Sequence, residues 1–397
     1  MWAGRHVVVG VTGGIACYKA CHLVRRLAES GARVDVVVTR GAAEFVRPLT
    51  FEALSGRPVL TSLWEPERAL AHVRLGQSAD LIIVAPATAH FLGRLAAGMA
   101  DDFLTAMCLA RTTPLLVAPA MNDEMFAAEA TQANLRTLGE RGVAVVGPDR
   151  GALAEGPSDR PGRMSEPETI LHHARRVVQA GSRLAGRRVV VTAGPTREAL
   201  DPVRVVTNRS SGKMGFRIAQ AAWYRGASVR LIAGPGSEPD PVGVEVERIE
   251  STDELEQAVR RALRDADVLV MAAAPADYRP ATVSDRKRSR QEGPVSVALE
   301  PTPDILTATR DARRPGALMV GFALETGNAL EKAAAKLVRK GLDLIVVNDA
   351  LEPGAGFEVD TNRVTLIDGS GAQQPVPFGT KAEVAEAIVN AIEVRLG

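Results

Sequence analysis

The sequence predicts an α/β protein built from two doubly wound, Rossmann-like domains. Two β-branched runs that end in glycine, at residues 6–14 and 188–195, are each followed by a helical pattern. A buried strand that breaks at glycine and opens a helix is typical of the first unit of a doubly wound sheet. After each run, short apolar segments alternate with helical patterns, which indicates a mostly parallel sheet covered by helices.

The other strands and the domain boundary follow from apolar runs and turn residues. We expect strands at residues 34–39, 81–85, 115–118 and 144–146 in the first half, and at 229–233, 268–272, 318–322 and 344–347 in the second. A chain of 397 residues is too long for one ordinary domain. Residues 147–162 are rich in Gly, Pro and Asp and predict a mobile loop, and residues 181–186 predict a linker. The predicted domains are residues 1–180 and 187–397.

Composition and charge argue against several classes of protein. Lys and Arg number 48 and Asp and Glu 47, so the formal charge of +1 gives no reason to expect nucleic acid or an anionic membrane as partner. The 3 cysteines are too few for a disulfide framework and are interpreted as small core residues. No apolar stretch approaches the roughly 20 residues of a membrane helix, and the start of the chain lacks a signal-peptide pattern. We therefore expect a cytoplasmic protein.

The glycines after the first strand predict a site for a single phosphate. Gly10, Gly13 and Gly14 do not have the G-x-G-x-x-G spacing of a dinucleotide fingerprint. A glycine turn at a helix N-terminus still offers backbone N–H groups and the positive end of a helix dipole, which suit a mononucleotide. By itself this signal is weak, because any turn between a strand and a helix can contain glycine.

Four further motifs strengthen this interpretation. They are T-G-G-I-A-x-Y-K at residues 12–19, H-x-x-L at 72–75, P-A-T-A at 86–89 and P-A-M-N-x-x-M at 119–125. Together they resemble the flavin-containing cysteine decarboxylases, in particular the phosphopantothenoylcysteine decarboxylases, over residues 6–164. The resemblance implies a flavodoxin-like first domain with FMN as its cofactor.

The resemblance also assigns residues to this site. It implies that FMN is bound by Gly13, Gly14, Thr39, Pro86, Ala87 and Thr88. Met121 would contact the substrate, His72 would be the base that assists thiol oxidation, and Asn122 would hydrogen-bond the substrate carboxylate. The alternatives are that His72 is a surface histidine and that Asn122 is a helix N-cap.

The chemistry explains why such an enzyme needs a flavin. A cysteine α-carboxylate in amide linkage has no electron sink, so loss of CO₂ would leave an unstabilised carbanion. Oxidation of the thiol by flavin places a C=S group β to the carboxylate, and this group accepts the electrons. The reduced flavin then returns hydride to the ene-thiol.

The chain departs from the family pattern at Glu155. The family has a cysteine in A-C-G before G-x-G-R-M, which protonates the ene-thiolate, whereas this chain has Ala154-Glu155-Gly156. A solvated glutamate is mostly ionised at neutral pH and is a poor acid, but a loop that closes over the flavin would desolvate the carboxyl group and favour its protonated form. Glu155 is therefore predicted to be the acid. The alternative is that Glu155 is a solvated loop residue and that Arg163 or water supplies the proton.

The second half resembles the phosphopantothenate–cysteine ligases. Residues 211–214 are similar to the end of a Walker A loop, but Met214 stands where that loop requires Ser or Thr, so a P-loop ATPase is not indicated. The ligase resemblance is carried by T-A-G-P-T-R-E at 192–198, D-P-V-R at 201–204 and T-N-R-S-S-G-K-M-G at 207–215. Further matches run to Asn348-Asp349 and span nearly all of residues 187–397.

The ligase resemblance implies an acyl-cytidylate mechanism. The carboxylate of 4′-phosphopantothenate attacks the α-phosphate of CTP, and the amine of L-cysteine then displaces CMP. Asn208 would hold the acyl intermediate. The triphosphate requires cations, and Mg²⁺ would bridge its phosphates with few protein ligands.

Two sets of residues are assigned by the same resemblance. The substrate-binding set is Arg204, Ser210, Ser211, Gly212 and Lys213. The nucleotide-binding set is Met271, Ala272, Ala273, Asp277, Lys287, Pro303, Asp304, Ile305, Leu306, Phe322, Lys336 and Lys340. Lys336 and Lys340 lie four residues apart and would share a helical face. Without the motifs, these lysines would be interpreted as a solvated surface.

The resemblance also implies that copies of the chain form an oligomer, and two other functions remain possible. In these families the ligase dimerises and the decarboxylase forms trimers whose interface completes the flavin site, so a fused chain can form a homo-oligomer, possibly a dodecamer. One alternative is an active ligase fused to a flavin domain with altered or lost decarboxylase turnover, because of Glu155. Another is a regulatory subunit with a flavoprotein fold.

Overall fold

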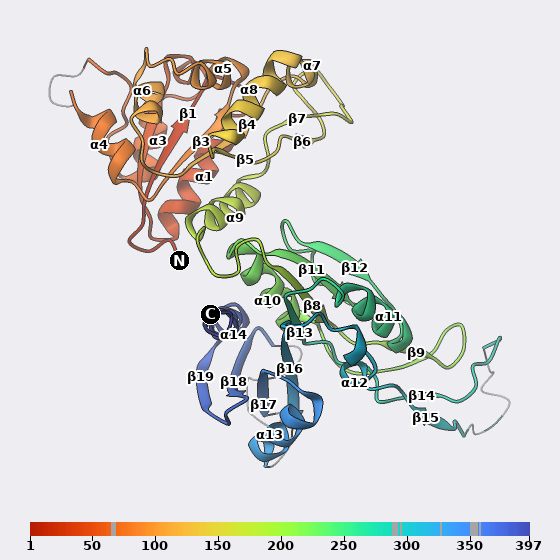
Figure 1. Cartoon of the computed structure of the whole chain (residues 1–397). Coiled ribbons are helices and arrows are strands. Elements are labelled where there is room, and N and C mark those ends of the chain that lie inside the picture. Colours follow the sequence, from red (N-terminus) through yellow and green to blue (C-terminus); the bar gives the residue numbers. More distant parts are fainter. Residues whose placement is uncertain (65–68, 288–292, 294–295, 326–327, 350–355, 357–358) are drawn as a thin grey trace. The chain divides into compact units, whose positions relative to one another are not determined.

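The computed structural model describes residues 1–64, 69–287, 293, 296–325, 328–349, 356 and 359–397. The chain divides into two compact units, Met1–Val178 and Gln179–Gly397, each of which is described by itself (Figure 1). Both units are α/β, with helices on both faces of a mostly parallel sheet. The predicted fold class is therefore confirmed.

The first unit contains a five-stranded, all-parallel sheet in the order β2-β1-β3-β4-β5. Its strands are β1 (His6–Val11), β2 (Arg33–Val38), β3 (Leu81–Ala87), β4 (Leu115–Pro119) and β5 (Ala144–Val145). This is the flavodoxin-like order, in which the direction of winding changes between β1 and β3. Both of these strands are buried along their whole length. A ligand site is expected at their carboxyl ends.

Alternate residues of β1 pack against different layers of helices. Val7 and Val9 belong to the hydrophobic cluster on one face of the sheet, and Val8 belongs to the cluster on the other. The first face is covered by α1 (Cys17–Glu29), α3 (Pro48–Ser55) and α9 (Pro167–Val178), and the second by α4 (Ala71–Ser78), α5 (Ala89–Ala96), α6 (Phe103–Leu109) and α8 (Glu129–Glu140). Because the sheet is covered on both faces, its strands are continuous apolar runs and not alternating ones.

The predicted loop at 147–162 is closed at its base by a short hairpin. β6 (Asp149–Arg150) pairs antiparallel with β7 (Pro161–Arg163), and the Ser165 hydroxyl donates to Asp149 Oδ1 at 2.8 Å. The connection between the two strands lies beside α7 (Asp123–Ala127). The glycine-rich composition identified the loop, but it did not reveal strands of two and three residues.

The second unit contains an eight-stranded sheet in the order β12-β11-β8-β13-β16-β17-β18-β19. Its strands are β8 (Arg188–Ala193), β11 (Ser228–Ala233), β12 (Glu245–Arg248), β13 (Val268–Met271), β16 (Leu318–Glu325), β17 (Leu344–Asp349), β18 (Thr361–Asp368) and β19 (Gln373–Thr380). The first six in spatial order are parallel and have the Rossmann order, with the switch point between β8 and β13. β18 and β19 extend the sheet as an antiparallel hairpin.

Helices cover both faces of this second sheet. One face packs against α10 (Lys213–Tyr224) and α14 (Lys381–Arg395), and the other against α11 (Thr252–Ala262), α12 (Ile305–Ala308) and α13 (Ala329–Lys340). A short 3₁₀ turn, η3 (Arg310–Ala312), follows α12.

Two small antiparallel pairs stand outside the main sheet of the second unit. They are β9 (Arg197–Ala199) with β10 (Val205–Thr207), and β14 (Tyr278–Pro280) with β15 (Leu299–Pro301). Figure 1 shows the second pair reaching away from that sheet. We refer to these two antiparallel pairs, each with the described residues between its own two strands, as the arm. The arm exposes large apolar side chains, among them Val203, Val205 and Tyr278.

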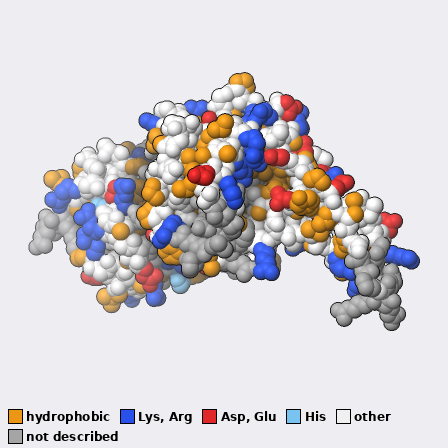
Figure 2. Space-filling view, turned by 90° about the horizontal axis from the view of Figure 1, so that it is seen from below, with side chains coloured by type: hydrophobic (Ala, Val, Ile, Leu, Met, Phe, Trp, Pro, Cys, Tyr) orange, Lys and Arg blue, Asp and Glu red, His pale blue; other side chains and the backbone are white. Residues whose placement is uncertain are grey.

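The cysteines, the helix lengths and the surface charges were also the subject of sequence expectations. Cys17 and Cys108 are buried free thiols, as expected of small core residues, and Cys21 is partly buried. Within the described residues, no helix is both long and apolar enough to cross a membrane. Figure 2 shows Lys and Arg side chains interspersed with Asp, Glu and hydrophobic side chains on the visible face, in keeping with the formal charge of +1.

Candidate active sites

The first unit has a cavity of about 840 Å³ at the carboxyl ends of β1 and β3. This is the switch point of its sheet, and the volume is within the ~300–1,000 Å³ typical of small-molecule sites. The predicted residues that line it are Gly13, Gly14, Thr39, Thr88, Met121, Asn122 and Glu155. They come from five separate connections, which follow β1, β2, β3, β4 and β6, so the fold brings together motifs that are far apart in the sequence.

The two glycines of the first turn have different roles. A Cβ on Gly13 would come within 2.6 Å of the backbone carbon of Gly41, so Gly13 allows the turns after β1 and β2 to pack together. A Cβ on Gly14 would meet only the Thr88 methyl group, at 3.6 Å. Packing therefore does not require glycine at position 14, whereas close approach of a ligand to the backbone would.

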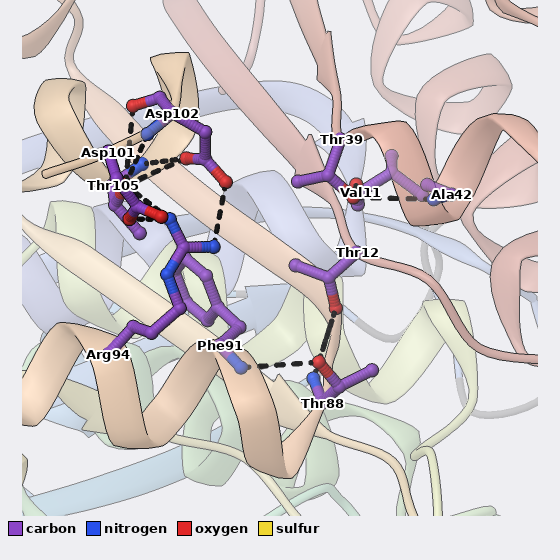
Figure 3. A network of polar contacts seen from close by, with 10 residues as sticks. All are labelled: Val11, Thr12, Thr39, Ala42, Thr88, Phe91, Arg94, Asp101, Asp102 and Thr105. Carbon is purple, nitrogen blue, oxygen red and sulfur yellow. Dashed lines mark hydrogen bonds and ion pairs between the residues drawn. The ribbon is translucent and has the colours of Figure 1, made fainter. Parts of the chain in front are cut away.

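Threonine hydroxyls surround this turn (Figure 3). Thr39 and Thr88 are the N-caps of α2 (Arg40–Ala43) and α5, and they accept from the backbone N–H groups of Ala42 and Phe91, each at 3.3 Å. The Thr12 hydroxyl donates to the Pro86 carbonyl at 2.8 Å. Pro86 and Ala87 are buried in β3 outside the cavity lining, so they position Thr88 and do not face a ligand themselves.

Arg94 also lines the cavity, although the sequence motifs did not indicate it. Its guanidinium group donates to Asp102 at 2.9 Å, to the Thr105 hydroxyl at 3.2 Å, and to Asp101 (Figure 3). Burial opposes the charge on Arg94, but the hydrogen bonds to the two carboxylates outweigh burial and raise its pKa. The side chain is 13% exposed, so a fixed positive charge lies at the edge of this cavity.

Asn122 is a helix N-cap and a cavity residue at the same time. Its Oδ1 accepts from the backbone N–H groups of Glu124 at 2.9 Å and Met125 at 3.3 Å, at the start of α7. The cap uses the oxygen of the amide and not Nδ2. The two interpretations from the sequence are therefore compatible, because the amide nitrogen can donate to a carboxylate while the oxygen caps the helix.

His72 lies outside the lining of this cavity. It is part of α4, and its ring is edge-on to Phe103 with centroids 6.1 Å apart. Its Nδ1 is buried and has no hydrogen-bond partner among the described residues. The single chain therefore does not bring the predicted base to the predicted flavin site.

Glu155 is at the tip of the loop between β6 and β7. Two backbone hydrogen bonds between Leu153 and Gly156, of 2.8 and 3.1 Å, form a tight turn around it. Farther along the loop, the Ser158 hydroxyl donates to Asp123 at 2.6 Å and lowers the pKa of this carboxyl group. Glu155 lines the cavity but is exposed. The proposed role of Glu155 as an acid requires burial of its carboxyl group, and the single chain does not bury it.

The second unit has a cavity of about 680 Å³ at the switch point between β8 and β13. Many residues that the sequence assigned to substrate or nucleotide line it. They are Asn208, Ser210, Ser211, Gly212, Lys213, Met271, Ala272, Ala273, Asp277, Pro303, Asp304, Ile305, Leu306, Phe322, Lys336 and Lys340. The cavity also includes Asn348, Asn362 and Lys381, which were not assigned to the site from the sequence.

Asn208 joins two loops of this cavity. Its Nδ2 donates to the carbonyls of Ala274 at 3.2 Å and Pro275 at 2.9 Å, which follow β13. The ligase resemblance implies that Asn208 holds the acyl intermediate, which its amide can do as a neutral donor. In the structure its two N–H bonds are directed to the protein, so that role requires one of them to be exchanged for the ligand.

Lys336 and Lys340 share one face of α13, as predicted from their spacing. Lys336 Nζ donates to the Phe322 carbonyl at 2.9 Å, and Lys340 Nζ lies 2.9 Å from Asp304 Oδ2. Burial would raise the pKa of Asp304, but the hydrogen bond and charge of Lys340 outweigh it and hold the pKa below its usual value. Both lysines therefore bring positive charge to the cavity from a fixed position.

Two assigned residues lie outside this lining. Arg204 is in the arm, where its Nε donates to Asp201 at 2.8 Å and holds the pKa of this carboxyl group down at about 2. Lys287 is exposed in the connection between β14 and β15. The single chain does not bring either of them to the cavity.

Comparison with known proteins supports two joined enzymes. Residues 1–179 match the family model described as Flavoprotein, and residues 184–395 match the DNA/pantothenate metabolism flavoprotein C-terminal domain. A curated protein of Vibrio cholerae, "Coenzyme A biosynthesis bifunctional protein CoaBC", is 44% identical over 398 residues, which cover 99% of each chain.

Further similar proteins bear the same name. The CoaBC protein of Mycobacterium tuberculosis H37Rv is 47% identical over 403 residues, covering 98% of this chain and 96% of that protein. A solved CoaBC C-terminal domain is 38% identical with a TM-score of 0.47, covering 54% of this chain and 98% of that one. Because two relatives are 44% and 47% identical over nearly the full length, the chain belongs to the CoaBC family, the bifunctional enzymes of coenzyme A biosynthesis that join a phosphopantothenoylcysteine decarboxylase to a phosphopantothenate–cysteine ligase.

Proposed function

We propose that this chain makes 4′-phosphopantetheine from 4′-phosphopantothenate, L-cysteine and CTP, using FMN and Mg²⁺. The ligase part of this proposal rests on one observation, which is that Asn208, Lys336 and Lys340 line the same cavity. The full-length similarity to bifunctional proteins favours this reading over a chain with only ligase activity and over a regulatory subunit.

In the ligase unit, the residues supply position and charge. Lys336 and Lys340 attract the triphosphate, while Asn208 fixes the loop after β13 against which the reacting carboxylate would lie. Asp277 is a cavity carboxylate on the nucleotide side. No group of three or more possible metal ligands occurs in the described part of the chain, so we infer that Mg²⁺ is held mainly by the phosphates of CTP.

The product mixture tests the ligase chemistry. With purified protein, CTP should support amide formation better than ATP, and CMP and pyrophosphate should appear in step with phosphopantothenoylcysteine. Mass spectrometry and phosphate assays separate these products. If ADP and inorganic phosphate were formed instead, the activated intermediate would be an acyl phosphate and the proposed acyl-cytidylate would be wrong.

The first cavity fits FMN. The position of Gly14 leaves room for close backbone approach, and the hydroxyls of Thr39 and Thr88 stand beside the N-termini of two helices. These hydroxyl and N–H groups can bind one phosphate of a ligand and the polar atoms of the ligand next to that phosphate. When bound there, FMN would supply the two-electron oxidation of the substrate thiol and its later reversal. Asn122 would orient the substrate carboxylate as a neutral donor.

We infer that a second copy of the chain completes both sites. His72 lies outside the flavin cavity and Arg204 lies outside the ligase cavity, although both are assigned by the motifs. The arm that carries Arg204 exposes Val203, Val205 and Tyr278, which is the kind of apolar surface that a partner covers. Trimers of the first unit and dimers of the second are compatible in a dodecamer.

The Glu155→Gln variant tests the final protonation. Glutamine keeps the size of the side chain but cannot deliver a proton, so one CO₂ should be released per flavin while the ene-thiol product accumulates, the flavin stays reduced and 4′-phosphopantetheine formation falls by roughly 10²- to 10⁴-fold. Glu140→Gln, at an exposed position of α8 outside the cavity lining, is the matched control. Measuring CO₂ and the two thiol products separately decides the question. Unchanged phosphopantetheine formation in Glu155→Gln would remove Glu155 from the mechanism.

A further inference from the structure

One end of the ligase cavity contains a buried lysine that none of the motifs includes. Lys381 is the first residue of α14, directly after the N-cap Thr380, and it is 4% exposed. Its Nζ donates to the Gly356 carbonyl at 2.9 Å, and its backbone N–H donates to the Asp360 carbonyl at 2.8 Å. The residue lines the cavity. Its charged group is therefore held in place by the segment before β18.

Other polar groups of the cavity come from the start of α10. The N-cap of this helix is Gly212, whose φ of +76° is in the left-handed region and which offers no capping side chain. The helix therefore begins with backbone N–H groups and a positive dipole end at the cavity. Lys213 follows, and its Nζ lies 2.6 Å from Asp360 Oδ1. Both lysines thus contact the segment that leads into β18.

The charges around Lys381 are mixed but close together. Lys213 and Arg217 approach it from α10, Asp360 from the segment before β18, and Glu238 from the segment after β11. Burial is the largest influence on the Lys381 ammonium group, followed by the charge of Lys213, and together they lower its pKa to about 8. A cation that is destabilised in this way would gain from an anionic ligand.

We propose that Lys381, with Lys213 and the start of α10, binds a phosphate group of one of the ligase substrates. This proposal rests on the proposed ligase function, in which two of the three substrates, 4′-phosphopantothenate and CTP, contain phosphate. The shared chemistry is a phosphate dianion, contributed either by the 4′-phosphate of phosphopantothenate or by the triphosphate of CTP. Lys381 is thus a specificity-determining residue, because a substrate without that phosphate would lose a charge-assisted hydrogen bond to the ammonium group.

Steady-state kinetics of three variants test the assignment. In Lys381→Met the KM for one phosphorylated substrate should rise roughly 10- to 100-fold, as expected for the loss of a charge-assisted hydrogen bond, with a smaller change in kcat. Lys381→Arg should retain most of the affinity. Lys332→Met, which removes an exposed lysine outside the cavity lining, should behave as wild type. An increase confined to phosphopantothenate identifies the 4′-phosphate, and an increase confined to CTP identifies the triphosphate.

The wild-type protein provides a second test that does not depend on folding of a variant. Lys381 is protonated below its pKa of about 8 and neutral above it, so phosphate affinity should be full at pH 7 and fall as pH rises through 8. Calorimetric titration with phosphopantothenate and with CTP, each alone, measures this without turnover. Lys381→Arg stays charged over the same range and should give a flat profile.

Two outcomes would overturn the proposal. One is an unchanged KM for both substrates in a folded Lys381→Met protein, and the other is an affinity for both ligands that is independent of pH between 7 and 9. Failure of the CTP-dependent ligase chemistry would look different. Wild-type protein would then form no amide with CTP, whereas binding of phosphopantothenate would still report on Lys381.

Discussion

The Asn208→Ala variant should form phosphopantothenoylcysteine roughly 10²- to 10³-fold more slowly than the wild-type protein, the loss typical of removing one positioned donor at a reacting centre. The structural reason is that Asn208 Nδ2 holds the carbonyls of Ala274 and Pro275, and the amide would also contact the acyl intermediate. The rate of amide formation with saturating CTP measures the effect. FMN content and CO₂ release from added phosphopantothenoylcysteine should be unchanged, because these belong to the other unit.

Asn390→Ala is the matched control for this change. Asn390 is an exposed asparagine on α14 that accepts a hydrogen bond from Arg225 at 2.6 Å and lies outside the cavity lining. It should retain wild-type ligase activity. If Asn208→Ala formed the amide at the wild-type rate, the assignment of Asn208 to the reaction would be wrong, and its two hydrogen bonds would be structural only.

His72→Gln should reduce CO₂ release by roughly 10²- to 10⁴-fold, the contribution usual for a general base. Glutamine cannot accept a proton from the substrate thiol at neutral pH, but it is close to histidine in size. The ligase activity and the FMN content should persist. His22→Gln, which changes an exposed histidine of α1, should have no effect on CO₂ release.

Mixing two inactive variants shows whether His72 acts in a neighbouring copy. His72→Gln and Asn122→Ala change residues that the single chain does not place in one cavity. If the flavin site is shared between copies, co-expression of the two variants should restore part of the CO₂ release, because some interfaces then combine an intact His72 with an intact Asn122. If no activity returns from correctly assembled mixed oligomers, the shared site is contradicted.

The sequence predicts the parallel strands better than it predicts the sheet edges. Apolar runs identified β1, β3, β8 and β13, because strands that are covered on both faces must be continuously apolar. β19 gave no such signal, since Pro375 and Pro377 interrupt it and many of its residues are exposed. Proline is tolerated there because β19 is an edge strand with a free side.

Candidate residues were found from the sequence where motifs exist, and missed where only the fold brings residues together. Asn208 and Thr88 were identified by their motifs, and each lines its cavity. Arg94 and Lys381 were not identified, because a lone basic residue has no distinctive spacing and its burial depends on tertiary packing. The positions of His72 and Arg204 also could not be inferred. A sequence motif does not indicate whether a side chain contributes to the site of its own chain or to the site of a neighbouring copy.

The β18–β19 hairpin has a consequence for the order in which the two activities can arise during synthesis. The flavin cavity is lined by residues between Thr12 and Met164, so the ribosome has made the whole of it before the second unit begins. The ligase cavity combines Asn208 with Lys381, and therefore cannot form until residue 381 has been synthesised and has left the ribosome. Because domains generally fold as units from the N-terminus, the first unit can fold while the second is still being synthesised. Termination of synthesis after the first unit and before Lys381 would then leave a first unit without amide-forming activity.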